Sequence, residues 1–366
     1  MNISFEKKEF SEKVSIASRF ALQRHATLPA LASLLIIASD DGVKLRSTNL
    51  ETAADLKVRG TCREKGVAAV PAAILSQISS SLSGEGEVTL EQVGETLTVK
   101  TGTSKSVIKT VPYDDFPSIP FPESGTNRIV LPGATLKMLF SALAPCASAS
   151  SVRPELASIY LSIEGGVLTA VATDSFRLAE KKIPLTGRGA QGKLLIPAKN
   201  AADIAHVLPN EDVIVSFDEH QCAFIGDFGT FITRLTNSVY PDYRQIIPKE
   251  SIVEAIVLRR DFESALRRTA VFSDSFQKIT LHFDPKKNLL SFEARNADIG
   301  ESNESVPAKV SGDSIDLSFN HRYLATVLGL SNTESISFVA TGVGRPLLIR
   351  GVGDPSLLYL VSPMNQ

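Results

Sequence analysis

The segment FSEKVSIASRF, residues 10–20, sets a pattern that returns twice in the chain. Its apolar residues at positions 10, 14, 16, 17 and 20 fall near one face of a helix with 3.6 residues per turn and predict an amphipathic helix. Similar segments, LKMLFSALAPC and FESALRRTAVF, start at Leu136 and Phe262, about 126 residues apart in each step. The sequence therefore predicts three copies of one structural unit.

Two further markers repeat at nearly the same spacing of about 122 to 126 residues. Pro71, Pro197 and Asn320 each precede a second helical segment, and both residue types suit the start of a helix. A strand, a tight turn and a second strand precede the third marker, which is Asn49, Asp174 and Asn296. The agreement of three markers makes a chance repeat improbable.

Each copy alternates helical segments with strands of period-2 hydrophobicity, which favours antiparallel hairpins. The expected fold class is α+β, with three tandem similar domains that each carry antiparallel strands and two helices on one side. Two segments rich in proline and aromatic residues, PYDDFPSIPFPESG and YPDYRQIIPKES, mark the boundaries. They place the domains at residues 1–122, 128–248 and 250–366.

The composition, with 43% hydrophobic and 21% charged residues, is typical of a soluble globular protein. The N-terminus is too charged for a signal sequence, and no apolar run approaches the ~18 residues that span a bilayer. We therefore expect a cytoplasmic or nucleoid-associated protein with no membrane contact. Cys62, Cys146 and Cys222 share no metal-binding spacing and are expected to be buried free thiols. The net charge of −2 does not exclude a local basic surface for nucleic acid.

No set of residues with catalytic or metal-binding spacing stands out in the sequence. The five histidines share no ligand pattern, and the zinc-protease, nucleophile-elbow and Walker motifs are absent. We expect no catalytic residue, no metal and no cofactor. The helical segments are instead rich in basic residues, which favours a nucleic-acid surface, although ordinary solvated helix faces are the alternative. These residues are Lys13, Arg19, Lys137, Lys199, Arg260, Arg267, Arg268 and Arg322.

The stretch VATDSFRLA, residues 171–179, concentrates polar groups directly after an apolar strand. From the residues alone, a turn followed by a core leucine is favoured over the rim of a docking pocket. Asp174 is expected to order this turn through the backbone.

Five segments in order resemble the bacterial beta sliding clamp family over the whole chain. They are RHATLPALASLLI (24–36), YDDFPSIP (113–120), TAVATDSFRLA (169–179), YPDYRQIIP (240–248) and YLVSPM (359–364). The resemblance implies a head-to-tail homodimeric ring around duplex DNA, with helices lining the hole and sheets outside. It implies sequence-independent DNA contact at the replication fork and no chemistry of its own. A short peptide motif would dock the replicative polymerase, the clamp loader and repair proteins.

The resemblance also implies a pocket for that peptide, with Thr173 and Arg177 as polar groups at its rim. The expected pocket residues are Leu156, Thr173, Ser175, Phe176, Arg177, Leu178, Pro241, Gln245, Ile246, Leu360, Val361, Ser362, Pro363 and Met364. This chain departs from the family pattern at Ser175 and Phe176, where Gly-His is frequent, at Gln245, where a basic residue is frequent, and in its SPMNQ tail. We expect these departures to change the preferred peptide.

By the same resemblance, Arg24, Lys137, Arg153 and Lys199 are expected to contact DNA, and Ala73 replaces a frequent basic residue. The expected dimer interface joins the strand SKSVIKT to the third domain, with Ile108 and Phe272 at its apolar centre. Its charged residues are Lys105 and Lys109 on one side and Asp298, Glu301 and Glu304 on the other.

Two alternatives remain open from the sequence. One is an enzyme whose catalytic residues come from different repeats, and the other is a monomeric protein-interaction scaffold with the same fold.

Overall fold

The computed structural model describes residues 1–22, 28–82, 84–102, 104–122, 127–185, 191–248 and 250–364. Within these residues the chain has six α-helices and twenty-five strands. They form two compact units, the first comprising Met1–Lys137 and Ala202–Leu235, the second Met138–Ala201 and Thr236–Gln366. Helices α3 (Gly133–Leu143) and α4 (Ala198–Val207) each contribute residues to both units.

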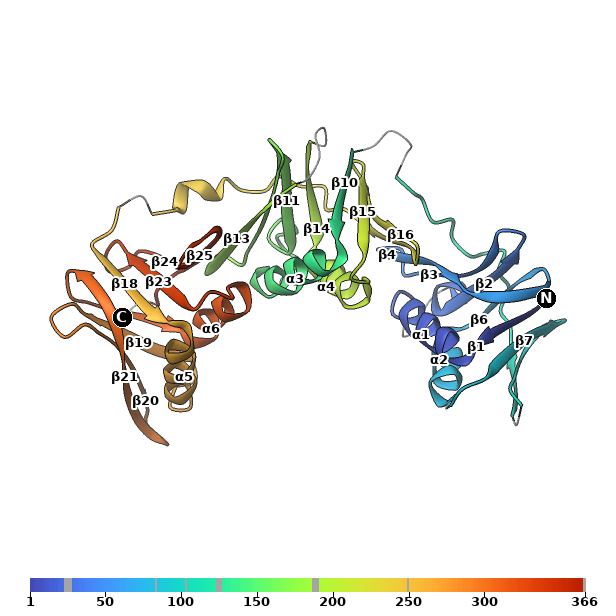
Figure 1. Cartoon of the computed structure of the whole chain (residues 1–366), viewed down its shortest axis with the longest axis horizontal. Coiled ribbons are helices and arrows are strands. Elements are labelled where there is room, and N and C mark those ends of the chain that lie inside the picture. Colours follow the sequence, from blue (N-terminus) through green and yellow to red (C-terminus); the bar gives the residue numbers. More distant parts are fainter. Residues whose placement is uncertain are drawn as a thin grey trace. The chain divides into compact units, whose positions relative to one another are not determined.

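The first unit contains two antiparallel sheets (Figure 1). The smaller sheet has the order β5-β1-β7-β8-β9 and the larger the order β10-β15-β16-β17-β4-β3-β2-β6. The strands are β1 (Asn2–Glu6), β2 (Ser33–Ser39), β3 (Gly42–Thr48), β4 (Thr52–Val58), β5 (Gly60–Glu64), β6 (Gly66–Pro71), β7 (Glu87–Val93), β8 (Thr96–Lys100), β9 (Lys105–Lys109), β10 (Asn127–Pro132), β15 (Asp212–Phe217), β16 (Gln221–Gly226) and β17 (Gly229–Arg234).

Helices α1 (Lys7–Ser18) and α2 (Ala72–Ser81) pack side by side against these strands (Figure 1). Helix α1 buries Phe10, Val14 and Ala17, which are three of the five apolar positions that the sequence pattern placed on one face. Phe10 stacks on Phe5 of β1 with the ring centroids 5.5 Å apart. This aromatic contact joins the helix to the smaller sheet, because Phe5 lies in the second strand of that sheet.

The second unit contains one antiparallel sheet of twelve strands, with the order β14-β11-β12-β13-β25-β24-β23-β18-β21-β20-β19-β22. The strands are β11 (Ser158–Glu164), β12 (Val167–Thr173), β13 (Arg177–Pro184), β14 (Gly192–Pro197), β18 (Val253–Leu258), β19 (Lys278–Asp284), β20 (Leu289–Asn296), β21 (Gly300–Gly312), β22 (Ile315–Asn320), β23 (Ser335–Ala340), β24 (Leu347–Gly351) and β25 (Asp354–Val361).

Helices α5 (Arg259–Ala270) and α6 (His321–Leu330) belong to the second unit and contact each other. The buried side of α5 carries Phe262, Ala265, Leu266 and Thr269. Phe262 meets Phe338 of β23 and Phe292 of β20 at centroid distances of 5.1 and 5.6 Å. Short 3-10 helices lie at η1 (Pro29–Ala32), η2 (Ala144–Cys146) and η3 (Tyr243–Ile246).

The three segments that share the FSEKVSIASRF pattern form α1, α3 and α5, and the three strand–turn–strand segments form the hairpins β2–β3, β11–β12 and β19–β20. Asn320 starts α6 as expected, because its side chain accepts a hydrogen bond from the backbone N–H of Arg322 at 2.9 Å.

Cys146 and Cys222 are buried free thiols, as the sequence predicts, and burial raises the pKa of Cys146 to about 12. The prediction is wrong for Cys62, which is only half-buried because it lies in the edge strand β5. No helix in the described part of the chain is long and apolar enough to span a membrane.

Candidate functional site

The turn between β12 and β13 is built from the polar residues of the VATDSFRLA stretch. Asp174 Oδ1 accepts hydrogen bonds from the backbone N–H groups of Phe176 and Arg177 at 2.9 and 3.0 Å. The Thr173 hydroxyl donates to the carbonyl of Arg177 at 2.6 Å and accepts from the N–H of Ser175 at 3.1 Å. The expectation that Asp174 orders the turn is confirmed.

Ser175 occupies the left-handed region of backbone space, with φ of 79°. A side chain in this conformation is unfavourable, whereas glycine adopts it without steric cost. The turn nevertheless holds this geometry, because hydrogen bonds fix the residues on both sides of Ser175. The consequence is that the Phe176 side chain projects outward, with 60% of its surface exposed.

Arg177 ties this turn to two other segments of the second unit. Its guanidinium donates to Asp174 Oδ2 at 3.0 Å, to the hydroxyl of Thr326 at 2.6 Å and to the carbonyl of Pro145. The same group lies over the ring of Tyr323, with Cζ 4.6 Å from the ring centroid. Thr173 and Arg177 therefore act mainly inside the structure, where their polar groups satisfy one another and their neighbours.

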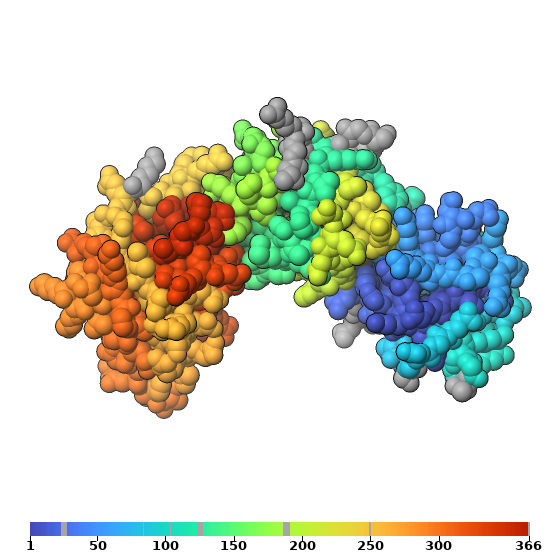
Figure 2. Space-filling view, in the orientation of Figure 1, coloured from blue at the N-terminus to red at the C-terminus, as the bar shows by residue number. Residues whose placement is uncertain are grey.

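The C-terminal strand β25 pairs with β13, so that Leu178 lies opposite Leu360 and Arg177 opposite Val361. Beyond this pairing, the N–H of Ser362 donates to the carbonyl of Phe176 at 2.7 Å. The N–H of Met364 donates to the carbonyl of Ser318 at 2.8 Å. The chain end is thus fixed against the turn, and Figure 2 shows the red C-terminal residues at the surface of this unit.

A pocket of about 730 Å³ opens at this junction. Among the residues expected there, Ser175, Phe176, Ser362, Pro363 and Met364 line it. The sequence reasoning missed five other lining residues, which are Asp274, Phe276, Lys278, Asn320 and Tyr323. The sequence predicts Asn320 only as the start of a helix, and the polar-aromatic segment SDSFQK, residues 273–278, is the local signal for Asp274, Phe276 and Lys278.

The remaining expected pocket residues do not line this pocket. Leu156, Thr173, Leu178, Leu360 and Val361 are buried, and Leu178 and Leu360 share a core cluster with Tyr243. Pro241, two residues before η3, and Gln245 and Ile246 within η3 are exposed and do not line this pocket. The Tyr243 hydroxyl donates to Glu180, and burial together with this hydrogen bond raises the pKa of Tyr243.

Two side chains order the segment 274–278 and the start of α6, which both contribute residues to the pocket. Asp274 Oδ1 accepts from the N–H groups of Phe276 and Lys278, each at 3.0 Å. His321, the first residue of α6, contacts Gln277 through a side-chain hydrogen bond of 2.8 Å and a backbone hydrogen bond of 2.9 Å. Burial lowers the pKa of His321, and the positive charge of Arg322 lowers it further.

The residues expected to contact DNA have different surroundings. Lys199 on α4 is exposed, and Lys137 on α3 donates to the Asn210 side chain at 3.1 Å. Arg153 pairs with Glu155 at 3.1 Å and keeps 60% of its side chain exposed. Arg24 lies outside the described residues.

Strand β9 ends the smaller sheet of the first unit and exposes Lys105 and Lys109. Ile108 does not present an apolar surface there, because its side chain is 95% covered by the unit's own core, whereas the neighbouring Val107 is 59% exposed. The alternation of a strand places these two side chains on opposite faces. Val107 is therefore the exposed apolar residue of this edge.

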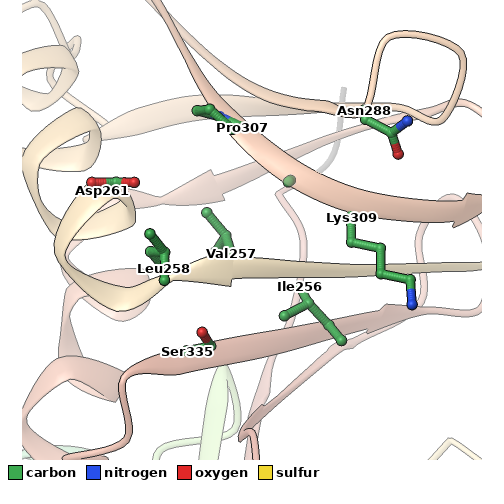
Figure 3. Close-up of a pocket in the computed structure, with 9 residues that line it drawn as sticks. Ile256, Val257, Leu258, Asp261, Asn288, Pro307, Lys309 and Ser335 are labelled. Carbon is green, nitrogen blue, oxygen red and sulfur yellow. The ribbon is translucent and has the colours of Figure 1, made fainter.

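Strand β21 of the second unit carries two of the acidic residues that are expected opposite β9, Glu301 and Glu304. Its residues 300–307 pair with β20, and its residues 308–312 pair with β18, so the strand leaves β18 at Pro307 (Figure 3). Glu304 forms an ion pair with Arg268 at 2.7 Å, which holds the pKa of Glu304 below its usual value. Glu301 lies 3.8 Å from Arg295, Asp298 is exposed and Phe272 is half-buried. An open hollow of about 550 Å³ lies beside the fork at Pro307.

Comparison with known proteins decides the family. The models of the N-terminal, central and C-terminal domains of the DNA polymerase III beta subunit match residues 1–120, 130–242 and 244–365. The chain belongs to the DNA polymerase III beta subunit family.

Relatives in this family carry the name beta sliding clamp. The Pseudomonas aeruginosa protein is 28% identical over 353 residues, which cover 94% of each chain. The Escherichia coli protein is 28% identical over 344 residues, which cover 93% of each chain. The crystal structure of the Pseudomonas aeruginosa beta subunit superposes with a TM-score of 0.93 at 25% identity over all of both chains. The Bacillus subtilis sliding clamp gives 0.94 at 25% identity, over 100% of this chain and 99% of its own.

Family membership gives the chain three tandem clamp domains and the function of a DNA sliding clamp. The beta subunit is the non-catalytic processivity subunit of the polymerase, which removes the enzyme alternative left open by the sequence. No group of three or more histidine, cysteine or acidic residues in the described part of the chain has the arrangement of a metal site.

Proposed function

We propose that this sliding clamp closes as a homodimeric ring around duplex DNA and docks its partners through the pocket beside Phe176. The observation that supports the docking site is the hydrogen bond from the Ser362 N–H to the Phe176 carbonyl, at 2.7 Å. It joins the turn after β12 to the chain end and leaves a pocket of about 730 Å³ with aromatic walls. The partners are the replicative polymerase, the clamp loader and repair proteins, each through a short peptide.

The shape and chemistry of the pocket suit a peptide with a large apolar side chain. Phe176 and Tyr323 stack with centroids 6.3 Å apart, and Met364 adds a flexible apolar surface. Exposed aromatic side chains at a concave site are typical anchors of peptide recognition. Leu178 and Leu360, which lie opposite each other on β13 and β25, belong to a buried core cluster next in sequence to the turn and the chain end.

Fluorescence anisotropy of a labelled peptide that carries the family's clamp-binding motif tests the docking site. The intact chain should bind saturably, and a variant that lacks residues 362–366 should not. Phe176→Ala should weaken binding by about 2 kcal/mol, roughly thirty-fold, because it removes an anchor wall. Phe121→Ala, which removes another exposed phenylalanine (44%), is the matched control and should bind normally. Equal binding by all four proteins would exclude this pocket.

For the ring, we propose that β9 of one protomer adds to the free side of residues 300–306 of β21 of its partner. Both are strand edges with unpaired backbone groups on one side in the described chain. Lys105 and Lys109 would face the acidic residues Asp298, Glu301 and Glu304, and Val107 would meet Phe272. Domain boundaries at residues 122–128 and 248–250 are part of the same proposal.

For DNA, we propose that Arg24, Lys137, Arg153 and Lys199 contact the phosphates from the ring's inner side. Lys199 is exposed and forms no ion pair with a described residue, so its ammonium group can neutralise a phosphate without losing another partner. A ring needs only weak contacts of this kind, since enclosure rather than affinity retains the DNA. The site of action would be the replication fork in the cytoplasm.

A further inference from the structure

Lys278 is a charged residue that lines the pocket, and the contacts of its backbone and its side chain differ. It is the first residue of β19, and its backbone N–H is fixed by Asp274 Oδ1 at 3.0 Å. The side chain is half-buried and lines the pocket next to Phe276. Its ammonium group forms no ion pair with any residue in the described ranges.

The other charged groups around the pocket are already engaged or add to the positive charge. Asp274 uses one carboxylate oxygen to accept two backbone N–H groups. Arg177 and Asp174 form an ion pair with each other at 3.0 Å. Arg322, in the first turn of α6, is exposed. Asp274 keeps its negative charge while its carboxylate orders the backbone, and Lys278 is the basic side chain among the lining residues, so its ammonium group is the one that can meet a carboxylate of a bound peptide.

The apolar walls place this charge beside an anchor site. Phe276 is 71% exposed and Phe176 60% exposed, and both line the same pocket as Lys278. A peptide that covers these rings would also remove water from around the ammonium group. A cation that loses water needs a partner of opposite charge, or binding becomes less favourable.

We infer that Lys278 is a specificity-determining residue of the docking pocket, which selects peptides that carry an aspartate or glutamate side chain beside the apolar anchor. This inference rests on the proposed docking function. The chemistry is a charge-assisted hydrogen bond from the Lys278 Nζ to a carboxylate, which is partly shielded from water by Phe276. The acidic residue fixes the register of the peptide, while the aromatic walls provide most of the affinity.

The test uses pairs of labelled peptides that differ only by Asp or Asn at one position on either side of the apolar anchor. At low salt, the intact chain should bind one Asp peptide about three- to tenfold more tightly than its Asn match. The preference should disappear in Lys278→Gln. Lys286→Gln, which removes an exposed lysine from the turn at the other end of β19, should keep it.

Charge reversal strengthens the test. Lys278→Glu should prefer the peptide with lysine at the selected position over the one with aspartate. The inference is overturned if the intact chain shows no preference at any position, or if the preference survives in Lys278→Gln. If neither peptide of any pair binds the intact chain, the docking pocket itself is wrong, an outcome distinct from binding without acidic preference.

Discussion

Asp174 is the residue on which the geometry of the docking turn depends. It accepts two backbone N–H groups and pairs with Arg177, which in turn contacts Thr326 and the ring of Tyr323. Loss of the carboxylate leaves the buried part of the guanidinium without its charged partner. The position of Phe176 and the cohesion of three chain segments thus depend on one side chain.

We predict that Asp174→Ala lowers the free energy of unfolding by about 2–3 kcal/mol, because three hydrogen bonds are lost at a half-buried site. Asp174→Asn should cost less, since its amide oxygen keeps the two backbone contacts while the ion pair is lost. Urea denaturation followed by circular dichroism measures both values. An Asp174→Ala protein as stable as the parent would show that the turn does not need these contacts.

We expect His321 to make the second unit sensitive to acid. Its pKa is lowered in the folded chain by burial and by Arg322, so the unfolded chain binds the proton more tightly. The stabilising contribution is therefore fully present above the unfolded pKa of about 6.5 and is lost as the pH falls through the lowered folded value.

We predict that the melting temperature of the intact chain decreases between pH 7 and pH 5, and that His321→Gln reduces this decrease. Thermal unfolding curves recorded at several pH values between 7 and 5 measure the melting temperature of each protein. Parallel curves for the intact chain and His321→Gln would contradict the assignment.

At the level of elements, the sequence predicts the helices and the hairpins, which depend on local patterns, but it does not predict the pairing of strands that are distant along the chain. The helices that begin near residues 7, 133 and 259 and the three hairpins follow from the period of the hydrophobic residues. The pairing of β13 with β25 joins residues about 180 positions apart, and no local pattern encodes it. The pocket combines residues from four such distant segments, which is why Phe276, Lys278 and Tyr323 were missed.

Strand β9 shows that the sequence alone does not predict which face of an edge strand is buried. Its alternation fixes two faces, but only the packing of the whole sheet decides which face is buried. Ile108 turned out to face the core and Val107 the surface. A shift of one residue thus changes the expected centre of the interface.

We predict that Val107→Glu weakens the dimer, because it places a negative charge opposite Glu301 and Glu304 of the partner's edge. Light scattering at micromolar protein should give twice 39.3 kDa for the intact chain and a mass nearer 39.3 kDa for the variant. Val93→Glu, at an exposed valine of β7, should remain dimeric. A monomeric intact chain would favour the scaffold alternative.

At the scale of the whole molecule, the slightly negative net charge is compatible with a protein that is retained on DNA by enclosure. A net charge of −2 gives no strong attraction to the duplex, so random binding along DNA is weak. A closed ring does not need such attraction, because its retention depends on topology. Partner docking then raises the local concentration of the polymerase at the primer end without any chemistry in the clamp.

The claim that the protein is held on DNA by enclosure is tested most directly by its retention on circular DNA. The chain is loaded onto a nicked circular duplex with ATP and the clamp loader of its source organism, and the complex is isolated by gel filtration. It is then compared before and after a restriction enzyme cuts the circle once. We predict that the protein co-elutes with the circle and separates from the linear product, because a ring slides off free ends. Retention that is unchanged after cutting would show direct adhesion to DNA and would contradict the sliding clamp mechanism.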